Sequence, residues 1–193
     1  MVNSSKKSEN KIINIGLTGK YASGKGEVAE ILKKLGFSYY SLSDVIREEL
    51  RKENKETSRE NMTIKGNELR EKYGAGVLGL KINELIKKDK SNKNIIDSVR
   101  NPFEVKALNK IENFHLIGID APIEIRFKRL KKRNREGDVK TLDEMKLAEE
   151  KENLSKDTNQ QLDKTLKLAE SIIINDTTKK ELETKILKIV NKF

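Results

Sequence analysis

GKYASGKG, residues 19–26, lies between an apolar segment at 12–17 and a helix-like segment at 27–35. Two glycines within it let the backbone turn tightly, so that successive N–H groups point inward toward an anion. Lys25 follows at the spacing needed to reach the outer phosphates, and the next helix presents its positive end to them. The pattern therefore predicts a cradle for the phosphates of a nucleoside triphosphate. The residues expected to contact this ligand are Gly19, Ala22, Ser23, Gly24, Lys25, Gly26 and Glu27.

The positions after the lysine depart from the usual form of such a loop. A Ser or Thr hydroxyl that contacts magnesium is expected there, whereas this chain has Gly26 followed by Glu27. A carboxylate near a helix N-terminus is favoured by the helix dipole but repels a bound phosphate. Two interpretations of Glu27 follow: its side chain points away from the phosphates, or it helps to hold hydrated magnesium.

The composition is that of one domain. A chain of 193 residues can bury a substantial core, and no second block of composition interrupts it. Residues 1–10 are polar and are expected to form a disordered tail, which leaves 11–193 as the domain. Aromatic residues make up only 5% and Trp is absent, so the core must be built mainly from Ile, Leu and Val. The apolar runs are too short to span a membrane, and a chain without cysteine is expected in the cytoplasm.

The formal net charge is +10, from 41 Lys and Arg against 31 Asp and Glu. The lysines are scattered along the chain and no aromatic stacking motif lies among them, so nucleic acid is not an expected partner. Phosphorylated small molecules account for the charge equally well, and a small nucleotide substrate is the partner that we expect. The sequence carries no pattern that specifies an oligomeric state.

Strand-like and helix-like segments alternate along the chain. Strands are predicted at 11–17, 37–41, 94–97, 115–120 and 171–175. Helices are predicted at 27–35, 44–53, 62–73, 76–88, 102–110, 122–134, 141–153, 160–169 and 179–191, with Ser43 as the N-cap of the second. This alternation predicts a three-layer α/β fold around a mostly parallel, five-stranded sheet. The helices at 44–90 are expected to bind the phosphoryl acceptor, and 126–153 is expected to form a lid.

Charged residues follow the predicted strands, at the edge where open α/β sheets bind ligands. Asp44 and Arg47 lie one turn apart at the start of the second helix, so one helix face offers a carboxylate and a guanidinium. Arg70 is a candidate for a second contact with an acceptor phosphate. Asp97 ends the third strand, where a carboxylate can hold magnesium through water, and Arg100 follows as a further substrate contact. Each arginine taken alone is as consistent with a solvated helix face.

The run RFKRLKKRNREGD places Arg126, Arg129 and Arg133 on one helical face and Arg135 in the following loop. Phosphoryl transfer requires mainly positioning and positive charge, because the transition state spreads negative charge over the transferred group. These arginines are therefore predicted to close over that group, with Arg129 and Arg133 as catalytic residues. A basic helix that only keeps the chain soluble is the alternative interpretation.

Taken together, these motifs resemble those of the P-loop nucleoside-monophosphate kinases. GKYASGKG is similar to the phosphate-binding loop of adenylate kinases, which also carry Gly after the lysine but usually follow it with Thr. The segment SLSDVIREEL resembles their acceptor-site helix. A wider resemblance covers about 11–190 and concerns the kinase-like domain attached to some deoxycytidylate deaminases and archaeal proteins related to dephospho-CoA kinase or adenylate kinase. The segments that carry it, in order, are YYSLSDVIREEL, GNELREKYGAGVL, IIDSVRNPFEV, IGIDAPIEIRFKRLKKRNRE, NQQLD and IINDTTKKEL.

The resemblance implies ATP-dependent phosphoryl transfer, with Mg²⁺, to a nucleoside or deoxynucleoside monophosphate. It also implies that Arg47 contacts the acceptor phosphate and that Asn175 to Thr177 line the adenine pocket. A helix near the site would carry Gln160, Gln161 and Asp163. Deamination is not implied, because the zinc-binding half of those deaminases has no counterpart in a chain without cysteine.

Two other functions are open at this point. A dephospho-CoA kinase would phosphorylate a hydroxyl, so Asp44 or Asp97 would have to take a proton. A nucleotide-binding sensor without turnover would account for the missing hydroxyl at Gly26 and the carboxylate at Glu27. Arg47, three residues after Asp44, favours a phosphate acceptor, since a hydroxyl acceptor makes less demand for a second cation.

Overall fold

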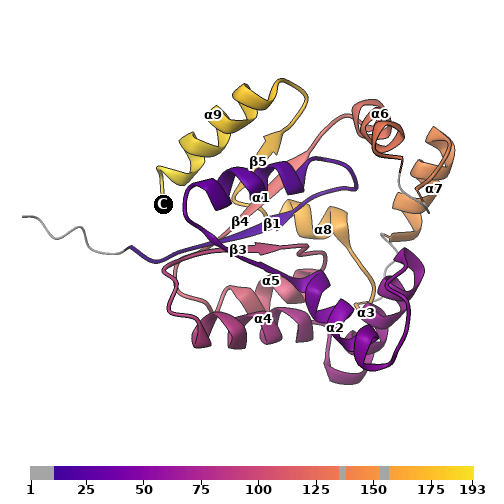
Figure 1. Cartoon of the computed structure of the whole chain (residues 1–193), viewed down its shortest axis with the longest axis horizontal. Coiled ribbons are helices and arrows are strands. Elements are labelled where there is room, and N and C mark those ends of the chain that lie inside the picture. Colours follow the sequence, from indigo (N-terminus) through magenta and orange to yellow (C-terminus); the bar gives the residue numbers. More distant parts are fainter. Residues whose placement is uncertain (1–10, 135–137, 153–156) are drawn as a thin grey trace, which may run out of the picture.

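The structure is a computed structural model that describes residues 11–134, 138–152 and 157–193. The predicted tail at 1–10 lies outside the described residues, as do Arg135 and the end of the predicted lid at 153. Within the described ranges, five parallel strands form one sheet with the order β2-β3-β1-β4-β5 (Figure 1). The strands are β1 (Ile13–Thr18), β2 (Ser38–Ser41), β3 (Lys93–Asp97), β4 (Phe114–Asp120) and β5 (Ser171–Ile174).

Helices connect the strands and cover both faces of the sheet (Figure 1). They are α1 (Lys25–Lys34), α2 (Leu42–Lys52), α3 (Arg59–Tyr73), α4 (Val77–Lys88), α5 (Pro102–Leu108), α6 (Ile123–Arg133), α7 (Leu142–Glu152), α8 (Leu162–Lys167) and α9 (Lys179–Val190). Helices α1 and α9 pack together on one face, whereas α4 and α5 pack together on the other. The predicted three-layer α/β fold with a parallel sheet is therefore confirmed.

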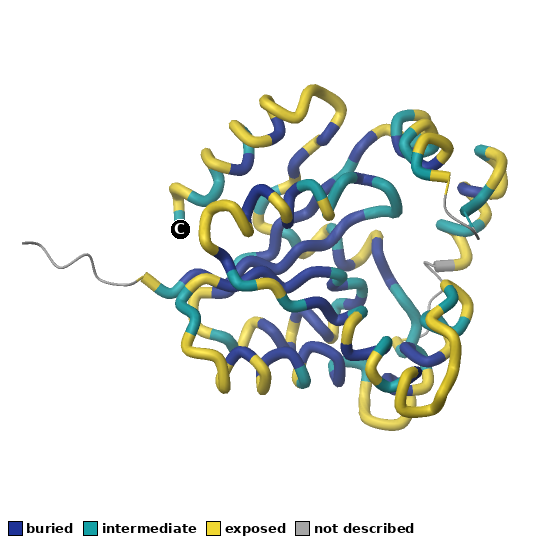
Figure 2. The backbone as a smooth tube through the Cα atoms, viewed as in Figure 1, coloured by how far each residue is buried: buried dark blue, intermediate teal, exposed yellow. Residues whose placement is uncertain are grey.

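The hydrophobic core is divided between the two faces of the sheet, because side chains along a strand alternate in direction. Along β4, Phe114 and Leu116 join a cluster with α2, α4 and α5, while Ile117 and Ile119 join a cluster with α1 and α9. Figure 2 shows the buried strands between helices whose outer faces are exposed. No helix within the described ranges has the length and apolar character needed to cross a membrane.

The starts of α2 and α8 differ from the predicted starts for identifiable reasons. The N-cap of α2 is Ser41 and not Ser43, because Ser41 Oγ accepts a hydrogen bond from the main-chain N of Ser43 at 3.2 Å. The helix therefore begins two residues earlier than predicted. Helix α8 begins at Leu162 and not at residue 160, because Gln161 has non-helical dihedral angles, with φ −132° and ψ 63°. The two glutamines thus precede the helix and leave it short.

Helices α4 and α5 approach each other closely at a glycine. A Cβ on Gly79 would lie 2.8 Å from the main-chain O of Glu104 and 3.1 Å from Cβ of Ala107. A main-chain oxygen inside a helix cannot move aside as the end of a flexible side chain can. The spacing of this helix pair therefore depends on the absence of a side chain at Gly79.

Gly79→Ala is expected to destabilise the protein by about 1–3 kcal/mol, because overpacking forces the helices apart. At an exposed helical position the same change would stabilise by about 1 kcal/mol. Urea unfolding followed by circular dichroism measures the difference, with Lys87→Ala on the exposed face of α4 as the control. An unfolding free energy for Gly79→Ala at or above that of the unchanged protein would contradict this packing argument.

Candidate functional site

The loop between β1 and α1 is folded tightly against the ends of β4 and β5. Gly19 has a φ of 148°, and a Cβ there would lie 2.0 Å from the main-chain O of Ile119. Gly24 has a φ of 101°, and a Cβ there would lie 2.1 Å from Nδ2 of Asn175. Ala22 is also left-handed, with a φ of 58°. Both glycines are therefore required for conformation and for space, as a phosphate-binding turn demands.

Lys25, the first residue of α1, bends back over this loop. Its Nζ donates hydrogen bonds to the main-chain oxygens of Gly19 and Lys20, at 2.7 and 3.2 Å. Ser23 is fully buried in the loop, and its Oγ has no hydrogen-bond partner among the described residues. Buried hydroxyls are nearly always paired, so this one fits a ligand that brings oxygen acceptors. The loop thus offers the cation and the donors that a phosphate chain requires.

The two positions that depart from the usual loop pattern have different causes. A Cβ at Gly26 would meet nothing within 4 Å, so packing does not exclude a larger residue there. The Glu27 carboxylate forms an ion pair with Nζ of Lys179, in the first turn of α9, at 2.5 Å. Hydrogen bonding to this carboxylate raises the pKa of Lys179. The pair offsets the repulsion that Glu27 would exert on a phosphate.

A cavity of about 700 Å³ opens over the loop, and we call it the loop cavity. Its volume lies within the range of small-molecule sites. Besides the loop and α1, its wall includes residues from β3, α6 and α9 and from the turns after β3 and β5. The lining residues outside the loop and α1 are Asp97, Arg100, Arg129, Arg133, Asn175, Thr177, Lys179 and Leu182.

Asp97, the last residue of β3, is buried at the wall of the loop cavity. Its Oδ2 accepts a hydrogen bond from the Tyr39 hydroxyl at 2.8 Å, and its Oδ1 accepts one from the main-chain N of Ser98 at 2.6 Å. Burial and the neighbouring carboxylate raise the pKa of Tyr39, so its hydroxyl remains a donor at neutral pH. The carboxylate is thus held in one orientation.

Asp97 is a single carboxylate ligand, which suits magnesium held mainly by water and phosphate. It does not suit a metal whose ligands all come from the protein. No group of three carboxylates, histidines or cysteines that could hold a metal occurs in the described part of the chain. Magnesium usually keeps several waters and is bound by one or two carboxylates together with substrate phosphates. A single fixed carboxylate beside a phosphate-binding loop meets that requirement.

A second cavity of about 370 Å³ adjoins the first, and we call it the helical cavity because α2 and α3 form much of its wall. Tyr21, Arg100 and Arg133 line both cavities, which places the two side by side. The other residues that line the helical cavity are Leu42, Ser43, Ile46, Arg47, Thr57, Arg59, Met62, Thr63, Arg70, Leu78, Ser98, Asp138 and Gln160. Its wall therefore combines an apolar part with hydroxyls and several guanidinium groups.

Asp44 and Arg47 are brought together at the start of α2, but only the arginine lines a cavity. The guanidinium Nη1 of Arg47 lies 2.5 Å from Oδ1 of Asp44, and both side chains are substantially exposed. Exposed ion pairs of this kind exchange partners at little cost. Arg47 can therefore turn to an anion in the helical cavity, while Asp44 lies outside the residues that line it.

Arg70 lies at the wall of the helical cavity, but its charge is already paired. Its guanidinium donates two hydrogen bonds to Oε1 of Glu104, at 3.1 and 2.8 Å. Arg70 is only 2% exposed and Glu104 is fully buried. The other carboxylate oxygen accepts from the main-chain N of Arg100 at 2.8 Å. Arg70 thus anchors α3 to α5, and a contact with an acceptor phosphate would be additional to that bond.

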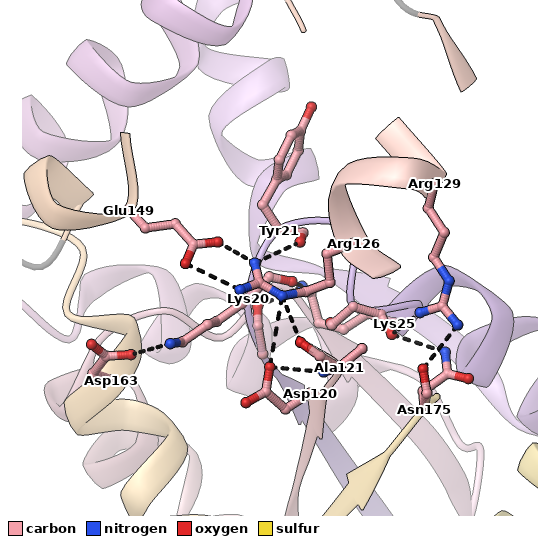
Figure 3. Close-up of polar contacts among 12 residues, drawn as sticks. Lys20, Tyr21, Lys25, Asp120, Ala121, Arg126, Arg129, Glu149, Asp163 and Asn175 are labelled. Atoms are coloured by element: carbon pink, nitrogen blue, oxygen red, sulfur yellow. Dashed lines mark hydrogen bonds and ion pairs between the residues drawn. The ribbon is translucent and has the colours of Figure 1, made fainter. Parts of the chain in front are cut away.

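The arginines of α6 have separate tasks. Arg126 is buried and donates to the main-chain O of Ala121 at 2.8 Å, to the main-chain O of Tyr21 at 3.3 Å and to Glu149 of α7 (Figure 3). It lines neither cavity, so it supports the loop and α7 and does not face a ligand. Arg129, in contrast, lines the loop cavity.

Arg129 and Arg133 reach the loop from the same helix by different contacts. Arg129 donates to the main-chain O of Asn175 at 2.8 Å and to that of Ser23 at 3.3 Å (Figure 3). Arg133 donates to Oδ1 of Asp138 at 2.8 Å and to the Tyr21 hydroxyl. The Asn175 side chain donates to the same Ser23 oxygen at 2.9 Å. These contacts place both predicted arginines beside the phosphate-binding loop.

Tyr21 is a site residue that the sequence reasoning did not identify. Two guanidinium groups lie over its ring, that of Arg59 at 4.4 Å and that of Arg133 at 4.9 Å from the ring centroid. Its hydroxyl donates to Asp138 at 2.5 Å. Burial and this hydrogen bond raise the pKa of Tyr21. The available signal was a tyrosine inside a loop otherwise made of small residues and lysine.

Replacing Glu104 by Gln is expected to destabilise the protein by about 3–5 kcal/mol, because it leaves the buried Arg70 without a compensating charge. Asp44→Asn removes a carboxylate from the exposed pair and serves as the control, with an expected urea midpoint close to that of the unchanged protein. The two variants are compared in the same urea titration. Equal urea midpoints for the two variants would show that the buried ion pair contributes no more to stability than the exposed one.

The comparisons with known proteins agree with this architecture. A family model described as an AAA domain matches residues 18–146. A UPF0200 protein of Pyrococcus abyssi is 34% identical over 185 residues, which cover 90% of this chain and 95% of that protein.

Among solved structures, TT1252 from Thermus thermophilus has a TM-score of 0.61 at 19% identity, over 95% of this chain and 98% of its own. Shikimate kinase from Aquifex aeolicus has a TM-score of 0.53 at 18% identity, over 93% and 97%. At these identities the likeness concerns the fold alone, which is that of the P-loop small-molecule kinases. The chain therefore belongs to the AAA-domain family and, together with the Pyrococcus abyssi protein, to the UPF0200 proteins, on a P-loop kinase fold.

Proposed function

We propose that this protein is a phosphotransferase that moves a phosphoryl group from ATP to a nucleoside or deoxynucleoside monophosphate. The observation that carries the proposal is the pair of adjoining cavities, which share Tyr21, Arg100 and Arg133 as lining residues. One cavity lies over a phosphate-binding loop and the other lies among helices with exposed cationic groups. A transfer between two phosphates requires two anion sites in contact, because the reacting oxygens must be aligned.

The donor nucleotide would occupy the loop cavity. Bound ATP with magnesium supplies the activated phosphoryl group and neutralises part of its charge. The main-chain N–H groups of the loop would hold the phosphates, Lys25 would contact the outer ones, and Asp97 would hold magnesium through water. Arg129 and Arg133 would stabilise the charge on the transferred group. Asn175 and the residues after it would lie against adenine, as in the nucleotide kinases that the sequence resembles.

The acceptor would occupy the helical cavity, with its phosphate on Arg47. The exposed pair with Asp44 can open for a stronger anionic partner, since phosphate offers the guanidinium a bidentate contact. Arg100 would add positive potential from the wall that the two cavities share, and Arg70, whose charge is compensated by Glu104, would add a further contact. The apolar wall of Leu42, Ile46 and Met62 fits the uncharged part of the acceptor.

A phosphate acceptor fits this cavity better than a hydroxyl acceptor such as dephospho-CoA. A hydroxyl must lose its proton to a base within hydrogen-bond reach, whereas a phosphate is already anionic. Asp44, the candidate base on α2, lies outside the lining of both cavities. Both carboxylate oxygens of Asp97 already accept hydrogen bonds from other groups, the Tyr39 hydroxyl and the main-chain N of Ser98.

A nucleotide-binding sensor without turnover is the second candidate, favoured by one observation. Gly26 supplies no hydroxyl for magnesium although a side chain would fit there. A sensor would bind ATP and change shape but release little ADP. Turnover and binding therefore have to be measured on the same protein.

The decisive assay is ADP release from ATP and magnesium, with a panel of ribo- and deoxynucleoside monophosphates and dephospho-CoA as acceptors. With the preferred acceptor, Lys25→Ala is expected to lower the rate by about 100-fold or more, because a cation at the transferred phosphate is lost. Lys34→Ala, an exposed lysine of the same helix, is the matched control and is expected to retain the rate. ATP binding without acceptor-dependent ADP release would instead support the sensor.

Arg47→Ala is expected to lower kcat/KM for the acceptor by about 10-fold to 100-fold, since a charged hydrogen bond to the acceptor phosphate is lost. The KM for ATP should change little, because Arg47 does not line the loop cavity. Arg51→Ala, an exposed arginine one turn further along α2, is the control. An equal loss of affinity for both substrates would place Arg47 outside the acceptor site.

A further inference from the structure

The segment before α8 packs against the turn that follows β3. It leads into residues 160–163, QQLD, which we call the QQLD motif. The buried Asn101 side chain donates from Nδ2 to the main-chain oxygens of Asp157 and Asn159, at 2.7 and 2.8 Å. The main-chain N of Gln161 donates to the main-chain O of Arg100 at 2.8 Å. The last bond explains why Gln161 lies outside the helix, because its main-chain N is used for docking.

The other end of the motif reaches the phosphate-binding loop. Asp163, in the first turn of α8, forms an ion pair with Nζ of Lys20 at 3.3 Å (Figure 3). The motif therefore joins the turn after β3 to the loop after β1. A segment that is distant in the sequence thus connects the two elements that would hold the donor phosphates and magnesium.

Arg100 is fixed at three points. Its main-chain N donates to the buried carboxylate of Glu104 at 2.8 Å, and its main-chain O accepts the bond from Gln161. Its guanidinium Nη1 donates to the side-chain Oε1 of Gln160 at 3.0 Å. Because the backbone and the side chain are both held, the guanidinium is preoriented in the wall that the two cavities share.

The partner of Arg100 is neutral, as are the main-chain oxygens to which Arg129 donates, whereas other arginines around the cavities have charged partners. Carboxylates face three of them, in the pairs Arg47 with Asp44, Arg70 with Glu104, and Arg133 with Asp138. Arg100 instead bonds to a neutral amide, and within the described ranges it forms no ion pair. Its hydrogen bond therefore fixes a direction without cancelling its charge. A full positive charge between two anion sites is favourable only when a ligand brings negative charge there.

We propose that Gln160 is a positioning residue that directs Arg100 toward a phosphoryl group lying between the two cavities and leaves its charge available to that group. The inference rests on the proposed function, since the phosphoryl group in question is the one transferred. A carboxylate at residue 160 would orient Arg100 equally well but would neutralise it. The neutral amide is thus the feature on which the role depends.

Two variants separate orientation from charge. Gln160→Glu keeps an acceptor for Arg100 but adds a negative charge, whereas Gln160→Met has a similar size and removes the bond without adding charge. If Gln160 acts by leaving the charge available, the Glu variant should be the worse of the two. A merely structural hydrogen bond predicts the reverse order, because only the Met variant loses it.

The affinity for inorganic tripolyphosphate and for ATP with magnesium is measured by isothermal titration calorimetry on the full chain. Gln160→Glu is expected to raise Kd by about tenfold or more, and Gln160→Met by about threefold or less. Lys164→Gln, an exposed change in α8 with the same change in net charge, is the control and should leave Kd unchanged. Similar thermal unfolding midpoints of the variants exclude loss of fold as the cause.

The same pair of variants is then made in an Arg100→Ala background. If the effect acts through Arg100, the two should differ by less than about twofold there, as a double-mutant cycle requires. A difference that persists without Arg100, or a Met variant as weak as the Glu variant, would overturn the inference.

Turnover is read separately from binding. A wild-type protein that binds tripolyphosphate and ATP but transfers to no acceptor would refute the proposed function, while the order of the two variants would still decide the role of Gln160. Where turnover is found, Gln160→Glu should lower kcat more than Gln160→Met does, because the charge matters most in the transition state. Binding of neither ligand by the wild-type protein would overturn both proposals.

Discussion

The contact between Gly19 and the main-chain oxygen of Ile119 is the constraint on which the site depends. Strands β1 and β4 are neighbours in register, with Thr18 opposite Gly118, so the chain that leaves β1 crosses the end of β4 directly. It can do so only without a Cβ. That path determines where Lys25 begins α1 and where the loop meets Asn175. The cradle is therefore a product of the parallel sheet as much as of a glycine-rich sequence.

The arginines around this edge of the sheet differ in their partners more than in their positions. Arg126 and Arg70 are buried against Glu149 and Glu104, where Arg126 joins α6 to α7 and Arg70 joins α3 to α5. Arg129 donates hydrogen bonds to the main-chain oxygens of Ser23 and Asn175. The same residue type therefore stabilises the scaffold at some positions and leaves positive potential for a ligand at others. Burial and the charge of the partner separate the two roles.

The strands, the helices and the phosphate-binding loop could be predicted from the sequence, because periodicity and glycine spacing are local properties. The environment of single side chains could not. The sequence places Arg70 on a basic helix, but its burial depends on Glu104, 34 residues away. The contacts of Tyr21 depend on Asp138, 117 residues away. Residues 160 and 161 were predicted to be helical but precede α8, because their long-range hydrogen bonds to Arg100 override the local preference.

Tyr21 lines both the loop cavity and the helical cavity, so the shapes of the two cavities are coupled at this residue. A substitution of Tyr21 that changes the shape of one cavity also changes the other. The ring contacts the guanidinium groups of Arg59 and Arg133, and its hydroxyl accepts a hydrogen bond from Arg133, so these groups would move together. Elsewhere the two walls are separate, because residues of α3 line only the helical cavity and residues of α9 line only the loop cavity, so a substitution there can alter one cavity and leave the other unchanged.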